Sequence, residues 1–370
     1  MKKRADGRYL KQVLIGQKEN GKPRYKNIYG TSKADVEQRA ALFKAEYEKG
    51  VAVLDDNLTF VMWADKWLKT YKSNVQYNTY KMYENIIKTH LSPALGSYKI
   101  KNIKKHHLQE VINNLIAQDK YSTARQARLT LKQIFDQAVE NEYVYKNPAS
   151  GITLPKQPKT QKRALTQQEV NLFTVADFAP KEKTFVYLIL YCGLRRGEAL
   201  ALKTSDIDFK NRKISINKSL IFKENDAEIK NMPKSEAGIR VIPVVDDLYD
   251  VLYDFANDKT GYIFTMENGK IMSKSSFRKF WNRIMNKVNE AAQKGKTPLS
   301  EDITPHMFRH TFATNLYYAG IDIKTAQYLL GHSSIKMTMD IYTHLESEET
   351  SKTQDILNQF YKKSSQKSVN

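Results

Sequence analysis

The residues best suited to chemistry begin at Thr304, in the segment Thr-Pro-His-Met-Phe-Arg-His-Thr-Phe-Ala-Thr-Asn-Leu. Thr304 is a good helix N-cap, and Pro305 suits the first helical turn. His306 and Arg309 would then lie three residues apart on one face of that turn. The free backbone N–H groups and the positive end of the helix dipole favour a phosphate at the same place. Taken alone, a His-x-x-Arg pair is common, and a solvated helix face is the simpler explanation.

Three further segments supply another arginine, another histidine and a tyrosine. Arg195 follows a helix-ending glycine in Cys-Gly-Leu-Arg-Arg-Gly-Glu, and His332 follows another in Leu-Leu-Gly-His. Tyr342 comes soon afterwards, in Thr-Met-Asp-Ile-Tyr-Thr-His. Cutting a phosphodiester without a metal requires cations for the non-bridging oxygens, a nucleophile in line with the leaving group and an acid that protonates it. Arginine suits the first task because its planar fork donates two hydrogen bonds and stays charged.

This ordered set resembles the tyrosine recombinase (phage integrase) family, whose catalytic domain combines a Gly-Leu-Arg turn with His-x-x-Arg, Leu-Gly-His and a late tyrosine. The matching motifs run from about residue 190 to 345, in the family's order. The resemblance implies an integrase of a phage or of a conjugative or other mobile element, which cleaves and rejoins DNA at specific sites. It also implies that no metal and no other cofactor takes part.

The resemblance further assigns a role to each residue. Tyr342 is expected to attack the scissile phosphorus, which gives a 3′-phosphotyrosyl link and a free 5′-hydroxyl. Arg195 and Arg309 are expected to hold the phosphoryl oxygens and stabilise the charge of the transition state. His306 is expected to assist proton transfer at the tyrosine, and His332 to donate a hydrogen bond to the phosphate.

Two more members are implied by the resemblance. A lysine between the two arginine motifs is expected to protonate the leaving 5′-oxygen. Lys234, in Met-Pro-Lys-Ser-Glu-Ala-Gly, fits best, and Lys230 is the competitor. Glu198, on the helix that opens after Arg195, matches an accessory acidic position and is expected to orient a catalytic neighbour. A glutamate that merely favours a helix N-terminus is the alternative.

Charge predicts the partner. The chain has 370 residues with 60 Lys and Arg against 40 Asp and Glu, a formal net charge of +20 and a pI near 9.6. Such a surplus attracts polyanions and releases counterions when it meets phosphates, so we expect double-stranded DNA as the partner. The single cysteine, Cys192, excludes an intrachain disulfide framework and a cysteine-clustered metal site. Without an apolar run of about 18 residues, we expect no membrane span and a cytoplasmic location.

The elements that must position these residues follow from composition and periodicity. Strand-forming residues at 9–15 and 24–29 flank an Asn-Gly turn, and Thr31 or Ser32 can cap a following helix. Residues 58–147 show apolar residues at helical spacing in four stretches. A basic, proline-punctuated segment then precedes a region of mixed helices and strands.

The expected fold class is multidomain α+β: a small N-terminal three-stranded β domain with a helix, a helical (SAM-like) core-binding domain, and a mainly α catalytic domain with a small antiparallel sheet. The expected boundaries are 1–55 for an arm-type DNA-binding domain, 58–150 for the core-binding domain, 151–163 for a linker, 164–345 for the catalytic domain and 346–370 for a C-terminal tail.

Assembly is also implied by the resemblance. We expect core-type and arm-type DNA sites, a homotetramer on DNA, and DNA-bending or excision accessory proteins as possible partners. Two alternatives from other classes are a type IB topoisomerase, which relaxes DNA without choosing a site, and a non-catalytic DNA-binding regulator. The complete set of catalytic residue types argues against the regulator.

Overall fold

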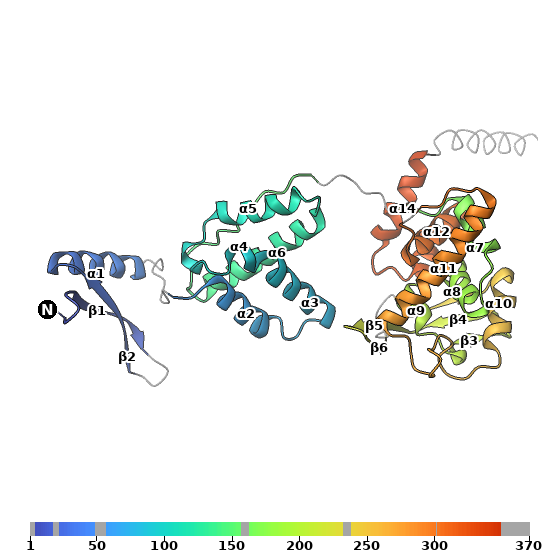
Figure 1. The fold of residues 1–370 in the computed structure, drawn as a ribbon, viewed down its shortest axis with the longest axis horizontal. Coiled ribbons are helices and arrows are strands. Elements are labelled where there is room, and N and C mark those ends of the chain that lie inside the picture. The colour runs from blue at the N-terminus through green and yellow to red at the C-terminus, as the bar shows by residue number, and fades with distance from the viewer. Residues whose placement is uncertain are drawn as a thin grey trace, which may run out of the picture. The chain divides into compact units, whose positions relative to one another are not determined.

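A computed structural model of the chain describes residues 4–17, 22–48, 57–156, 163–231, 238–300 and 302–348 (Figure 1). The chain separates into two compact units, Met1–Lys159 and Thr160–Asn370. Most of the expected tail lies outside the described residues. Within the described part of the chain, no helix is long and apolar enough to cross a bilayer.

The N-terminal segment folds as a hairpin covered by a helix. Strand β1 (Tyr9–Gln17) pairs antiparallel with β2 (Pro23–Gly30), and α1 (Lys33–Glu48) packs on both. Ser32 Oγ accepts a hydrogen bond from the backbone N–H of Asp35 at 3.1 Å, as expected of a helix cap. We expected three strands, but the described residues of this segment form two. Residues 4–8 precede β1 and close a turn, in which the backbone N–H of Arg4 donates to the Arg8 carbonyl.

The second part of this unit is helical, as predicted. Apolar residues at helical spacing in all four stretches are buried, and Trp63 Nε1 donates to the Ile134 carbonyl at 3.0 Å inside this core. The helix predicted near Tyr80 continues as a π-helical turn. The elements are α2 (Phe60–Tyr71), α3 (Tyr77–Asn85), η1 (Ile86–Leu91), α4 (Ser92–Leu95), η2 (Ile100–Asn102), α5 (Lys105–Ile116) and α6 (Tyr121–Glu140).

The second unit is mainly α with two small antiparallel sheets. Its helices are α7 (Gln167–Val175), α8 (Pro180–Tyr191), α9 (Arg196–Leu200), η3 (Thr204–Asp206), α10 (Asp246–Ala256), α11 (Lys274–Gly295), α12 (Pro305–Tyr318), α13 (Ile323–Leu330) and α14 (Ile335–Glu348). One sheet has the order β3 (Ile207–Asp208), β4 (Lys213–Ile216), β7 (Arg240–Pro243), and the other pairs β5 (Lys218–Lys223) with β6 (Asp226–Asn231).

Helix α8 lies in the core of this unit, and the chain leads from its C-terminal end to Arg195. Its residues from Thr184 to Leu190 are all buried, because α10 and α12 pack against it. A helix that is apolar on every side is typical of a core position. Beyond it, Gly193 adopts a left-handed conformation with φ +58°, which turns the chain into α9. The buried helix therefore fixes the backbone position of Arg195.

Candidate active site

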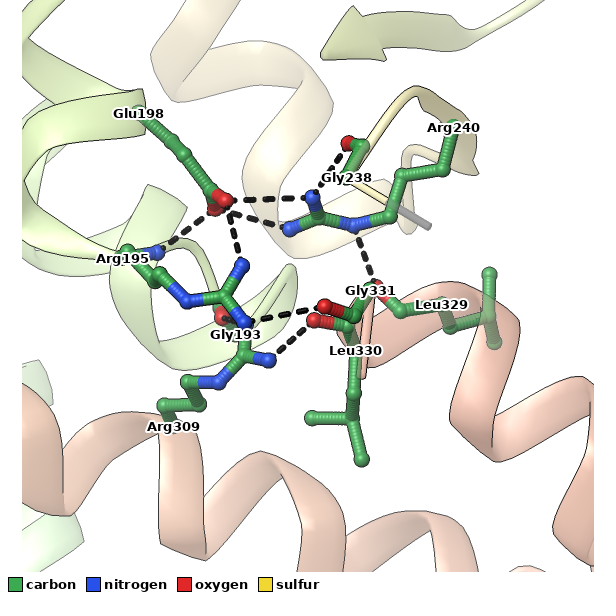
Figure 2. A network of polar contacts seen from close by, with 9 residues as sticks. All are labelled: Gly193, Arg195, Glu198, Gly238, Arg240, Arg309, Leu329, Leu330 and Gly331. Carbon is green, nitrogen blue, oxygen red and sulfur yellow. Dashed lines mark hydrogen bonds and ion pairs between the residues drawn. The ribbon is translucent and has the colours of Figure 1, made fainter. Parts of the chain in front are cut away.

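Three arginines from separate parts of the chain converge on the end of α13 (Figure 2). The helix ends at Gly331, which is left-handed with φ +61°. Its last carbonyls lack intrahelical donors and form the negative end of the helix dipole, so they attract cations. Three consecutive carbonyls each accept from a different guanidinium: Leu329 from Arg240 Nε at 2.7 Å, Leu330 from Arg309 Nη2, and Gly331 from Arg195 Nη2 at 2.9 Å.

Glu198 lies between two of these arginines. Its side chain accepts from Arg195 Nη1 at 2.7 Å and from the Arg195 backbone N–H at 2.9 Å, and from Arg240 at 2.8 and 3.2 Å. The residue is only 1% exposed. Burial by itself would raise the pKa of this carboxyl, but the hydrogen bond and charge of Arg240 and the charge of Arg195 outweigh it, and the pKa is lowered. Glu198 is therefore ionised and joins the two arginines.

Arg309 is the most deeply buried of the predicted cations, at 3% exposure. Its Nη1 donates to the Gly193 carbonyl at 3.0 Å, so α12 is tied to the turn after α8. Burial and then the charge of Arg195 lower the pKa of Arg309 to about 9, with Glu198 acting in the opposite direction. The network thus contains three guanidiniums and one carboxylate, which of the three contacts only Arg195 and Arg240, and the surplus positive charge favours a bound anion.

His332 follows the end of α13 and is buried. Its Nδ1 lies 2.9 Å from Thr338 Oγ1 on α14, and its backbone N–H donates to the Gln327 carbonyl. Burial, and then the charges of Arg309 and Arg195, lower the pKa of His332 to about 4. The imidazole is therefore neutral near pH 7 and can donate one hydrogen bond without adding charge.

Tyr342 lies on α14 and is buried, and its hydroxyl donates to the Ile321 carbonyl at 3.3 Å. Its ring stands edge-on to Tyr317 at 5.1 Å. Burial and then the charge of Asp322 raise the pKa of the phenol. The hydroxyl thus faces the connection between α12 and α13, and its observed partner is a carbonyl of that connection.

Not every predicted residue joins this network. His306 is exposed on the first turn of α12, with its ring 5.1 Å from that of His310. Lys234 lies outside the described residues, and Lys230 is exposed on β6. Our reading of the sequence missed Arg240. A signal existed, because Arg240 and Ile242 occupy the inward positions of a short alternating strand, where an arginine requires a partner.

Comparison with known proteins identifies the family. The profile of the Phage integrase family matches residues 163–349, and that of the Phage integrase N-terminal SAM-like domain matches residues 59–116. A XerC-like tyrosine recombinase of Caldanaerobacter subterraneus subsp. tengcongensis is 28% identical over 95% of this chain and 96% of its own length. The transposase from transposon Tn916 of Enterococcus faecalis is 31% identical over 60% of this chain and 58% of its own length.

Solved structures show the same fold. The Tn1549 transposon integrase in complex with transposon right end DNA matches 80% of this chain and 100% of its own chain, with a TM-score of 0.66 and 24% identity. A lambda integrase tetramer bound to a Holliday junction matches 91% of this chain and 93% of its own, with a TM-score of 0.59 and 20% identity. The resemblance seen in the motifs is confirmed: this chain belongs to the phage integrase family and is a site-specific tyrosine recombinase, an integrase of a mobile element that cleaves and rejoins DNA.

Proposed function

We propose that Arg195 and Arg309 hold the scissile phosphate while Tyr342 attacks it. The observation that carries this proposal is the anchoring of both guanidiniums on adjacent carbonyls of α13. A guanidinium has five N–H groups, and the bonds described above engage two in each of these arginines. Further donors can thus face a phosphate from fixed positions, and a fixed donor needs no reorganisation as the transition state forms.

Cleavage exchanges one phosphoester bond for another. The Tyr342 Oη–phosphorus bond forms while the bond from phosphorus to the 5′-oxygen breaks, which leaves a 3′-phosphotyrosyl link and a 5′-hydroxyl. The phenol proton passes towards His306, and Lys234 protonates the 5′-oxygen. The neutral His332 donates a hydrogen bond to the phosphate. Because the Tyr342 hydroxyl bonds to the Ile321 carbonyl in this structure, this hydrogen bond has to break before the attack.

The rest of the chain serves to place DNA on this site. We assign core-site binding to a domain over residues 58–150 and arm-site binding to residues 1–55, joined through the linker 151–163 to the catalytic residues 164–345. The surplus of 20 positive charges supports binding along the DNA backbone. Recombination cuts four strands in two duplexes, so four protomers gather on DNA, with the tail 346–370 reaching a neighbour and with bending or excision proteins as accessory partners.

A nicked core-site duplex that traps the covalent complex tests the roles of the arginines. We expect Arg195→Ala and Arg309→Ala each to slow covalent trapping by about 100- to 1,000-fold, because each loses a donor aimed at developing charge. Binding in a gel-shift assay should change only a few-fold. If binding and trapping fall equally, these arginines only hold the DNA backbone and the proposal fails.

A further inference from the structure

Arg240 is the most deeply buried guanidinium of the site, at 1% exposure against 3% for Arg309. Its side chain is fully buried, whereas that of Arg195 is 38% exposed. The described contacts use four of its donor interactions: with the Leu329 carbonyl, the Gly238 carbonyl and both carboxylate oxygens of Glu198. Arg309 is also buried but engages only two donors in the described contacts, whereas Arg240 engages four, so Arg240 is not placed to bind a DNA phosphate.

We propose that Arg240 is a positioning residue for phosphate-bond cleavage: it holds Glu198 and the end of α13 in the places from which they orient Arg195. This inference rests on the proposed role of Arg195. The contacts form a closed circuit, in which Arg240 binds Glu198, Glu198 binds Arg195, Arg195 binds Gly331, and the carbonyl two residues before Gly331 binds Arg240.

The charges explain why this circuit needs Arg240. Glu198 is buried, and each of its two oxygens accepts one hydrogen bond from Arg195 and one from Arg240. Without Arg240, the carboxylate loses half of these partners in a place where water does not replace them. It would then either bind Arg195 more strongly or take up a proton, and in both cases the direction of the Arg195 guanidinium changes.

The same substitution also releases the end of α13. The Leu329 carbonyl would lose its donor from β7, next to the carbonyls that hold Arg309 and Arg195. Both phosphate-binding arginines depend on this turn. A displacement of about 1 Å in such a group costs about 100-fold in rate. The inference therefore predicts a large loss of cleavage from a residue that never meets the DNA.

The test compares two DNA substrates on the full-length protein. One nicked core-site duplex carries the natural scissile phosphate, and the other carries a methylphosphonate there, which has no negative charge for an arginine to neutralise. Covalent trapping at saturating DNA is measured for Arg240→Gln, Arg240→Lys and Glu198→Gln. Arg195→Ala provides the reference for a direct loss of phosphate charge neutralisation.

The control is Arg163→Gln. Arg163 also makes a two-pronged bond to a buried glutamate of the same unit, Glu169, at 2.5 and 2.7 Å. The Arg163 side chain is 39% exposed, and its loss removes an arginine–glutamate pair of this unit without touching the circuit. Thermal unfolding and gel-shift binding of each variant establish that it is folded.

We expect Arg240→Gln to slow trapping on the natural phosphate by about 100-fold while DNA affinity stays within about two-fold. On the methylphosphonate the same variant should lose less than about five-fold relative to the unsubstituted protein, as Arg195→Ala should, because the misdirected cation is no longer needed. Arg240→Lys keeps the charge but lacks the fork, so its loss on the natural phosphate should be about ten-fold. Arg163→Gln should change neither rate by more than about two-fold.

Equal losses of Arg240→Gln on both substrates, or a loss no larger than that of Arg163→Gln, would overturn the inference. Should Arg240→Gln not fold, Arg240→Lys and Glu198→Gln are compared in the same way, by the ratio of their trapping rates on the natural phosphate and on the methylphosphonate. The two proposals fail separately. If Arg195→Ala itself shows no recovery on the methylphosphonate, the proposed role of Arg195 is wrong; if it recovers and the Arg240 variants do not, only the positioning role is wrong.

Discussion

His332 should make this protein sensitive to acid, and His332→Asn should remove part of that sensitivity. Burial, and then the charges of Arg309 and Arg195, lower the pKa of the imidazole from 6.5 to about 4, whereas in the unfolded chain the pKa returns to its ordinary value. Between these two pH values the unfolded state binds more protons than the folded state. The free energy of unfolding contributed by His332 is therefore fully present above pH 6.5 and is lost as the pH falls towards 4.

The magnitude follows from the two pKa values. A shift from 6.5 to about 4, at about 1.36 kcal/mol for each pKa unit, amounts to about 3 kcal/mol. Asparagine does not titrate, and it can keep a hydrogen bond with Thr338, which lies 2.9 Å from Nδ1. The difference in unfolding free energy between His332→Asn and the unsubstituted protein should thus move by about 3 kcal/mol in favour of the variant between pH 7 and pH 4.

The assay is urea unfolding followed by hydrogen exchange of peptides from residues 163–348, which separates this unit from the rest of the chain. Taking the difference between the two proteins cancels the titration of every other group. A nicked core site should also raise the pKa of His332, because the bound phosphate offsets the arginine charges. A difference in unfolding free energy that stays constant from pH 7 to pH 4 would mean that His332 is not held neutral by its surroundings.

Three further outcomes are expected. Tyr342→Phe should bind DNA nearly normally in a gel-shift assay and form no covalent complex; a persisting adduct would move the role of nucleophile to Tyr328 or Tyr317. Gly193→Ala should lower the free energy of unfolding by about 1–3 kcal/mol, measured by urea unfolding, because φ is +58° and the new methyl group would meet Phe312. Its covalent trapping should also fall, since the Gly193 carbonyl holds Arg309, and an unchanged trapping rate would contradict this. Deleting residues 1–55 should preserve cleavage of a core site and reduce recombination of full attachment sites; undiminished recombination would refute the arm-binding assignment.

Local signals in the sequence were sufficient for most of the elements. The proline in the first turn of α12 and the helix-ending glycines at Gly193 and Gly331 act within a few residues, and the structure has each of them where expected. Thr304 occupies the N-cap position of α12, although its side chain makes no capping hydrogen bond. For the N-terminal segment three strands were expected, and its described residues form the two at the positions that strand-forming composition indicated.

The contacts that create the site join residues that are far apart in the sequence. Arg240 and Glu198 are 42 residues apart, and their pairing depends on how β7 meets α9 in space. Charge patterning identifies both residues as ionisable but says nothing about which one is opposite the other. The direction of the Tyr342 hydroxyl is likewise set by packing against Tyr317, which no spacing rule predicts.

The carbonyls at the end of α13 also determine when, during synthesis, the enzyme can become active. The bond from Arg195 to Gly331 spans 136 residues, and that from Arg240 to Leu329 spans 89. A ribosome that has released both arginines has still to make the helix that holds them, and the proposed nucleophile Tyr342 comes later still. A nascent chain, or one shortened by a premature stop before α13, has neither these carbonyls nor the proposed nucleophile, so it cannot assemble the proposed catalytic site.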